Sequence, residues 1–213
     1  MSIGKGFKDL LDDVVTVPKE DVKDFGIGDR KLLLVIAGIS GSGKSYLEKN
    51  LISTYPEFFN KWEQFTTRLP RPGEKESKPY IFVTEETYDR FKDCLVGRVG
   101  IDGESNFGKT KYGSVPNFEK GKISTVILST EGILDLKKSI DRGEFECEVC
   151  IFGLDVDNSE IVQREGRDNE SLERERDVLN LADYRRKRAN GTYIIPDDVV
   201  KVVNEFFNIK IEK

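Results

Sequence analysis

The chain has 213 residues, of which 34% are charged and 37% are hydrophobic, and its formal net charge is −5. This size and balance fit one medium-sized globular domain with a hydrophobic core. The negative charge argues against a protein that coats nucleic acid or a membrane surface, because its field repels phosphate groups. The chain contains no histidine, which excludes histidine-based catalysis and histidine–metal sites.

The sequence contains three cysteines, Cys94, Cys147 and Cys150. The Cys147-x-x-Cys150 spacing occurs in redox and zinc sites, but here it lies in a strand-like run and no second pair exists. We therefore expect packed, reduced thiols rather than a metal or redox site. The sequence shows no signal peptide and no long apolar run, so we expect a cytoplasmic protein without membrane or nucleic-acid partners.

Residues 1–30 are predicted to be an N-terminal extension. Apolar residues from Phe7 to Val15 have helical spacing, and Pro18 would end that helix. Because amphipathic spacing alone is a weak signal, it favours a packing arm or a flexible leader over a helix that binds a partner.

The segment 31–54 contains the strongest motif of the chain. The apolar run 32–37 predicts a strand, residues 38–45 fit the pattern G-x-x-x-x-G-K-[ST], and a helix is expected from Tyr46. Glycines let the backbone curl and direct its N–H groups at phosphate oxygens, and the helix adds its positive N-terminal end. An accidental glycine-rich turn is the alternative, but the flanking strand and helix are the context that a phosphate-binding P-loop requires.

This motif predicts an ATP site. Lys44 would reach the β- and γ-phosphates, and the Ser45 hydroxyl would bind Mg²⁺. The predicted ATP-binding residues are Gly38, Ser40, Gly41, Ser42, Gly43, Lys44 and Ser45.

A stiff cationic loop is expected next. Arg68 and Arg71 lie three residues apart, among two prolines and a glycine. Arginine geometry suits bidentate contact with a phosphate group, so the loop is a candidate second phosphate site. A solvated turn that happens to carry charge is the other interpretation.

At this point the sequence resembles the guanylate kinase family. The similar elements occur in the family's order over about residues 31–209. The first is Thr66-Thr67-Arg68-x-Pro70-Arg71-x-Gly73-Glu74, which is followed by Tyr80 and Phe82-Val83 and then by Tyr112-Gly113-Ser114. The last two are an arginine-bearing lid from Arg164 to Glu170, which continues to Arg176, and the segment Tyr193-Ile194-Ile195-x-Asp197-Asp198. The combination is specific to the family, although the lid pattern alone is weak.

The resemblance implies roles for individual residues. The phosphate of a nucleoside monophosphate would be held by Arg68, Arg71, Tyr80 and Tyr112, and Ser114 would lie near its base. Either Arg164 or Arg167, together with Arg176, would close over the transferred phosphoryl group as catalytic residues, because phosphoryl transfer is assisted by mobile arginines. A solvated, charged helix is the alternative for this segment.

The sequence departs from the family pattern mainly around the base. Gln64 stands where the family usually has serine, and the base-reading carboxylate is matched by Glu104 or Asp102, whereas Arg98 has the wrong charge to accept the guanine protons. Ser129 and Glu131 would contact the base or a magnesium-bound water, or would form an ordinary strand end with a helix cap. Pro196 replaces an asparagine that commonly helps to seat adenine.

The expected fold is α/β, a P-loop NTPase-type parallel sheet flanked by helices. The strands are predicted at 32–37, 123–130, 146–153 and 192–195, and the cationic run 185–188 is expected on a solvated helix face. The resemblance implies a guanylate kinase-like domain at residues 31–209, with an expected core at 31–64 and 122–209, a monophosphate-binding insert at 65–121 and a lid at 158–176.

The predicted activity is that of an ATP-dependent nucleoside monophosphate kinase, with GMP or dGMP as acceptor and Mg²⁺ as cofactor. Three alternatives stay open at this stage: a kinase for another or a modified nucleotide, a catalytically inactive interaction module, and an ATPase coupled to a partner. The intact Gly43-Lys44-Ser45 disfavours the inactive module, and the acceptor-phosphate loop would be unexplained in an ATPase.

Overall fold

The computed structural model describes residues 27–70, 80–100, 110–165, 172–173, 175–188 and 192–212. Residues 1–26 of the predicted N-terminal extension lie outside these ranges, as do the predicted site residues Arg71, Glu104 and Arg167, with the alternative Asp102. Arg164 lies in a described helix, but its side chain is outside the description.

A five-stranded sheet forms the core, and every paired strand in it is parallel. In spatial order the strands are β2 (Phe59–Lys61), β7 (Ile123–Ile127), β1 (Leu32–Gly38), β8 (Glu148–Asp155) and β9 (Tyr184–Lys187). A parallel sheet needs crossover connections that cover its faces, so this core confirms the predicted α/β fold.

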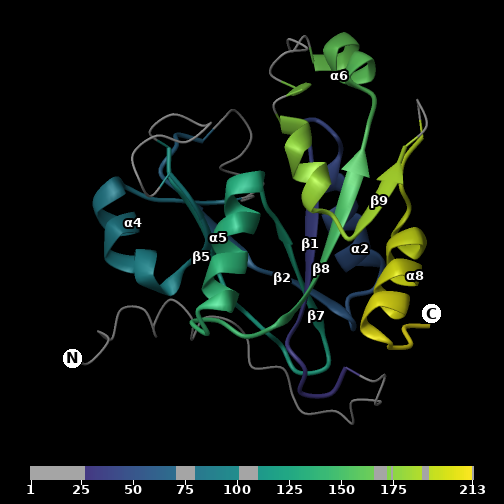
Figure 1. Ribbon diagram of the computed structural model, residues 1–213, viewed down its shortest axis with the longest axis horizontal. Helices are drawn as coiled ribbons and strands as arrows, with labels where there is room; N and C mark the ends of the chain where they lie inside the picture. The colour runs from purple at the N-terminus through teal and green to yellow at the C-terminus, as the bar shows by residue number, and fades with distance from the viewer. Residues whose placement is uncertain are drawn as a thin grey trace.

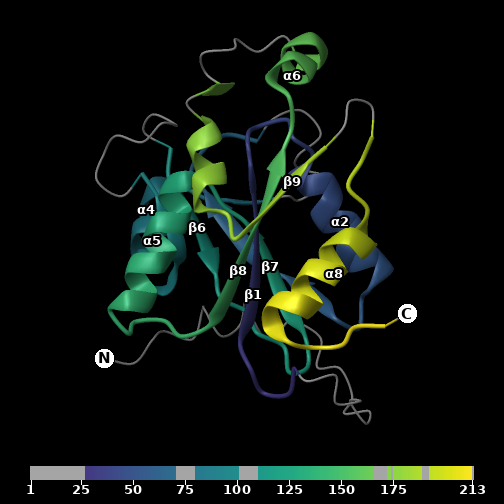
Figure 2. The same ribbon diagram turned by 45° about the vertical axis from the view of Figure 1, so that its right-hand side comes forward.

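Helices cover both faces of this sheet (Figures 1 and 2). Leu32, Leu34 and Ile36 of β1 join the apolar cluster under α2 (Lys44–Thr54) and α8 (Pro196–Phe207). Leu33 and Val35 point to the other face, where they join α5 (Thr130–Asp141) and the 3₁₀ helix η2 (Arg176–Leu181). This alternation explains why the central strand is apolar at every position: both of its faces are buried.

A smaller four-stranded sheet lies beside the core (Figure 1). Its strands, in spatial order, are β4 (Ile81–Phe82), β3 (Glu63–Thr66), β6 (Tyr112–Val115) and β5 (Val96–Val99), accompanied by α4 (Glu85–Phe91) and the 3₁₀ helix η1 (Lys92–Cys94). Gly97 lets β5 approach the start of α5, because a Cβ atom there would lie 2.9 Å from the side chain of Leu128, which precedes the helix, and 3.6 Å from the Gly132 carbonyl oxygen within it. The small sheet is formed by the segment in which an insert was expected at residues 65–121, but its first strand, β3, begins two residues earlier, at Glu63.

Two predictions at the C-terminal end of the core are wrong. Residues 192–195 are not a strand, and the last strand is β9 at Tyr184–Lys187, within the cationic run expected on a helix. Among the described residues β9 pairs with β8 alone, at the edge of the sheet, so its charged side chains reach solvent. Arg188, just beyond β9, is instead buried and forms an ion pair with Glu160.

The other expected strands are confirmed with shifted ends. β7 stops at Ile127 because Ser129 caps α5, and β8 runs to Asp155 rather than residue 153. The helix α6 (Asn158–Glu165) follows β8 and projects beyond its carboxyl end (Figure 2). In the described part of the chain, no helix is long and apolar enough to cross a membrane.

The cysteines form no site in the described structure. Cys150 is buried, Cys147 is partly buried and Cys94 is exposed, and all three are free thiols. Burial raises the pKa of Cys147 and of Cys150 to about 12, so both stay protonated at neutral pH. This agrees with packed, unreactive thiols for that pair.

Candidate active site

The glycine-rich segment 38–45 connects the carboxyl end of β1 to the first turn of α2. Gly41 and Gly43 have positive φ angles of 81° and 96°, and a Cβ atom on Gly38 would lie 2.8 Å from the carbonyl oxygen of Leu154. Larger residues would therefore be strained or would clash here. The sequence pattern thus gives a tight loop that ends at a helix N-terminus, the geometry that binds phosphate groups.

Lys44 folds back over this loop. Its ammonium group donates to the carbonyl oxygens of Gly38 and Ile39, at 2.8 Å each. The hydroxyl of Ser42 is buried and has no hydrogen-bond partner within the described structure. Ser45 lies exposed in the first turn of α2, where its hydroxyl oxygen can bind a hard cation.

The predicted acceptor-phosphate residues that are described come together on the small sheet. The Arg68 guanidinium carbon lies 5.1 Å from the centre of the Tyr80 ring and 5.4 Å from that of Phe82. Tyr80 also packs edge-on against Tyr112, with 5.9 Å between ring centres. Arg68, just after β3, and Tyr80, just before β4, thereby form one cluster with Tyr112 of β6.

Gln64 connects this sheet to the core. Its Nε2 atom donates to the Ser114 hydroxyl at 3.3 Å and to the Ile127 carbonyl oxygen at 3.0 Å. Because a carbonyl oxygen can only accept, the Ile127 contact fixes which end of the Gln64 amide is the nitrogen. The structure therefore brings Gln64 and Ser114 together at the carboxyl end of β7.

Ser129 and Glu131 lie just beyond that strand end. The Ser129 hydroxyl accepts a hydrogen bond from the Gly132 backbone N–H at 3.3 Å and caps α5, and Glu131 lies in the first turn of the helix. A helix cap, one of the two interpretations from sequence, is confirmed for Ser129; a contact with the base stays a prediction for both residues. Arg98 is bound by Asp135 of α5 through its backbone N–H and its guanidinium.

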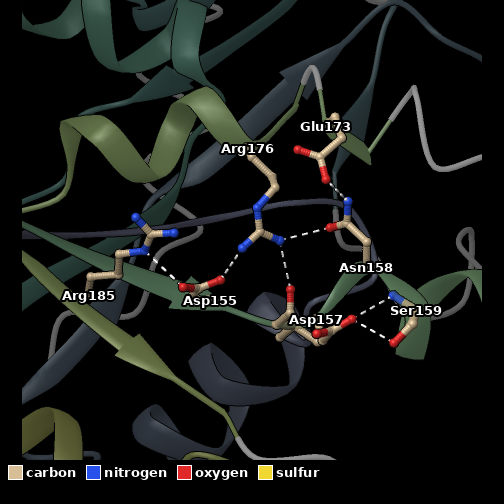
Figure 3. A network of polar contacts seen from close by, with 8 residues as sticks. Asp155, Asp157, Asn158, Ser159, Glu173, Arg176 and Arg185 are labelled. Atoms are coloured by element: carbon tan, nitrogen blue, oxygen red, sulfur yellow. Dashed lines mark hydrogen bonds and ion pairs between the residues drawn. The ribbon is translucent and has the colours of Figure 1, made fainter.

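Arg176 lies in a polar network at the carboxyl end of β8 (Figure 3). Its Nη2 donates to Asp155, and its Nη1 donates to the Val156 carbonyl oxygen at 2.9 Å and to Asn158 Oδ1 at 2.8 Å. Asp155 also accepts a hydrogen bond of 2.9 Å from Arg185 Nε. The predicted catalytic arginine is thus held by the turn between β8 and α6.

An open hollow of about 590 Å³ lies in front of this network. Its lining combines the cations Arg176 and Lys187 with acidic and amide groups that include Glu173 and Asn158. Glu175, next to Arg176, accepts a 2.6 Å hydrogen bond from the Ser40 backbone N–H. The hollow and the glycine-rich loop are therefore neighbours.

Comparison with known proteins identifies the family. The model of the guanylate kinase family matches residues 30–182 of the chain. This chain belongs to the guanylate kinase family. The guanylate kinase of Nitratidesulfovibrio vulgaris is 26% identical over 186 residues, covering 85% of this chain and 87% of that protein. The guanylate kinase of Sus scrofa is 32% identical over 142 residues, covering 65% of this chain and 70% of that protein.

The fold agrees with this assignment. The crystal structure of guanylate kinase from Anaplasma phagocytophilum matches with a TM-score of 0.57 at 20% identity, over 85% of this chain and 86% of that chain. The guanylate kinase family match ends at residue 182, so the resemblance suggested for Tyr193–Asp198 lies beyond it.

Three residues of the site were missed from the sequence: Asp155, Glu175 and Arg185. None of the three matches a residue to which the guanylate kinase resemblance gives a role. A signal existed for Asp155, which is a charged residue at the end of an otherwise apolar strand, where parallel sheets place ligand-binding groups. Arg185 belongs to the cationic run 185–188, which was expected on a solvated helix face, and Glu175 lies within the predicted lid without a role of its own.

Proposed function

We propose that this chain transfers the γ-phosphoryl group of ATP to GMP or dGMP. The observation that carries the proposal is the presence of two separate phosphate-type sites on one chain. One is the glycine-rich loop with Lys44, and the other is the cluster of Arg68, Tyr80 and Tyr112 on the small sheet. A kinase acting on a nucleotide needs both, whereas an ATPase needs only the first.

The domain organisation follows from this proposal. Residues 31–64 and 122–209 form the core that binds ATP, and residues 65–121 form the insert that binds the monophosphate. Residues 158–176 form the lid, in which Arg164 or Arg167 acts with Arg176. Arg71 would bind the acceptor phosphate together with Arg68.

Mg²⁺ fits the oxygen chemistry of the loop. The exposed Ser45 hydroxyl is a hard ligand, and Mg²⁺ is usually held by few protein oxygens together with phosphate oxygens and water. The described residues contain no cluster of three acidic or thiol ligands that would form an independent metal site. When bound, Mg²⁺ neutralises charge on the β- and γ-phosphates.

The protein's part in the chemistry is positioning and charge neutralisation. Lys44 is held at the loop and would bind the transferred phosphoryl group, while Arg68 and Arg71 would orient the acceptor phosphate. No general base is required, since the attacking oxygen belongs to an anionic phosphate.

Base recognition is proposed to involve Gln64, Ser114, Ser129 and Glu131, with Glu104 as the carboxylate that accepts guanine protons. The structure-based support is that Gln64 and Ser114 are hydrogen-bonded to each other beside the Ile127 carbonyl. Because Gln64 replaces the usual serine, another or a modified nucleotide is the second candidate acceptor. A cytoplasmic location stays a prediction.

The test is ADP release from ATP and Mg²⁺ with GMP, dGMP, AMP, UMP, CMP and dTMP offered separately. Turnover with GMP or dGMP supports the proposal, and a strong preference for a pyrimidine contradicts the guanine assignment. The Lys44→Ala variant should lose at least about 100-fold in turnover. A variant with normal turnover would refute the role of the loop.

A further inference from the structure

Asp155 lies between two arginines at the carboxyl end of β8 (Figure 3). Its Oδ1 accepts from Arg176 Nη2, and its Oδ2 accepts from Arg185 Nε at 2.9 Å. The Asp155 side chain is 11% exposed, so its carboxylate is largely removed from water and depends on these cations. No motif of the sequence gives this residue a role.

The turn that begins at Asp155 fixes the orientation of Arg176. The Val156 carbonyl and Asn158 Oδ1 accept from Arg176 Nη1. The Asn158 amide is itself held, because its Nδ2 donates to Glu173 Oε1 at 2.6 Å. Three acceptors from one short segment therefore fix the plane of the guanidinium.

These contacts use three of the five N–H groups of Arg176, both on Nη1 and one on Nη2. The remaining two are on Nε and Nη2, and they have no partner within the described parts of the chain. Two N–H groups on neighbouring guanidinium nitrogens are the pair with which arginine binds a phosphate group in a bidentate manner.

Arg176 is also close to the glycine-rich loop. Glu175, the preceding residue, contacts the Ser40 backbone N–H at 2.6 Å, and Leu154, the residue before Asp155, pairs with Gly38 in the sheet. The backbone and the side chain of Arg176 are thus anchored on two segments that adjoin the loop.

We propose that Asp155 is a positioning residue: it orients Arg176 so that its remaining N–H pair meets the phosphoryl group in transfer. The inference rests on the proposed kinase function. Arg185 binds the second oxygen of Asp155, so two cations face this one carboxylate and balance its charge. An unpaired Asp155 would instead repel the nucleotide.

The experiment compares Asp155→Asn with Asp157→Asn. Asp157 is a matched control, because it is exposed, lies two residues away and accepts hydrogen bonds from Ser159 rather than from Arg176. We expect Asp155→Asn to lower kcat about tenfold with KM for ATP and GMP within about twofold, and Asp157→Asn to leave both unchanged. Asp155→Glu, which restores the charge, should recover part of kcat.

A double-mutant cycle with Arg176→Lys separates positioning from a structural role. Arg176→Lys alone should lower kcat about 100-fold, and adding Asp155→Asn should cause little further loss, because the residue that Asp155 orients is already gone. The Arg176 Nε–H signal in ¹⁵N–¹H spectra should shift or broaden in Asp155→Asn without nucleotide. Thermal unfolding would show whether the variants remain folded.

Several outcomes would overturn the inference. Unchanged or increased kcat in Asp155→Asn would do so, as would losses that are additive with those of Arg176→Lys or an unchanged Nε–H signal. Each of these leaves the proposed kinase function intact if the wild type still turns over GMP. A wild type that transfers phosphate to no nucleotide would instead remove the proposed function, and with it this role of Asp155.

Discussion

The carboxylate of Glu175 accepts a 2.6 Å hydrogen bond from the backbone N–H of Ser40, within the phosphate-binding loop. An anionic side chain therefore lies against a loop that binds an anion in the proposed reaction. Because a carboxylate and a triphosphate repel each other at this range, ATP binding should be accompanied by loss of the Glu175 contact.

Replacement of Glu175 by glutamine should strengthen ATP binding. Glutamine keeps an acceptor for the Ser40 N–H but removes the negative charge, so the Kd for ATP should fall about fivefold, equivalent to roughly 1 kcal/mol. Isothermal titration calorimetry measures this change. Asp177→Asn is the control, because it removes the same charge from an exposed residue two positions away. Equal affinity in Glu175→Gln and wild type would show that the contact does not oppose binding.

Arg68→Lys should weaken binding of the monophosphate. Lysine cannot stack as a flat guanidinium on Tyr80 and Phe82, nor can it bind phosphate in a bidentate manner. The KM for GMP should rise about tenfold or more while the KM for ATP stays nearly constant. Steady-state kinetics with each nucleotide varied in turn measures the split, and Arg90→Lys on exposed α4 serves as control. A parallel rise in both constants would argue against a site specific for the acceptor.

Gly38→Ala should destabilise the protein as well as the loop. The new Cβ atom would lie 2.8 Å from the Leu154 carbonyl oxygen, which is backbone of a central strand and cannot move cheaply. We expect a loss of about 2 kcal/mol or more in the free energy of unfolding. Gly28→Ala, at a positive φ of 54° with no atom within 4 Å of the new Cβ, should cost only about 1 kcal/mol. Urea denaturation compares the two, and equal losses would rule out the clash.

Glu48→Gln should change the pH dependence of stability. Burial raises the pKa of Glu48 above its ordinary 4.5, although the nearby Lys61 and the Thr125 hydroxyl partly offset this. The folded protein therefore binds this proton more readily than the unfolded chain, and stability is lost as the pH rises from about 4.5 through the folded-state pKa.

The glutamine variant lacks this ionisation, so its stability relative to wild type should increase as the pH rises from 5 to 8. Thermal or urea unfolding at both pH values provides the measurement. Exposed Glu57→Gln should show no such trend. If the variant instead loses stability relative to wild type as the pH rises to 8, the ion pair of Glu48 with Lys61 outweighs the cost of burying the carboxylate.

Much of the fold was predictable because its signals are local. The apolar run of β1, the glycine-rich loop and the start of α2 are contiguous in the chain, and each has a steric or hydrogen-bonding reason to form. The last strand was misplaced for the converse reason. β9 is polar and becomes a strand only because β8 offers a free edge, whereas the apolar residues at 192–195 suggested a strand that does not form.

The sequence by itself determined the family and the phosphate-binding loop, because both depend on residue types at fixed spacing along the chain. Only the tertiary structure decided which charges meet. Asp155 contacts arginines 21 and 30 residues away, and Glu175 contacts a loop 135 residues away. Such pairs depend on the order of strands in the parallel sheet, which brings the carboxyl ends of β1, β8 and β9 together, and no local pattern encodes that order.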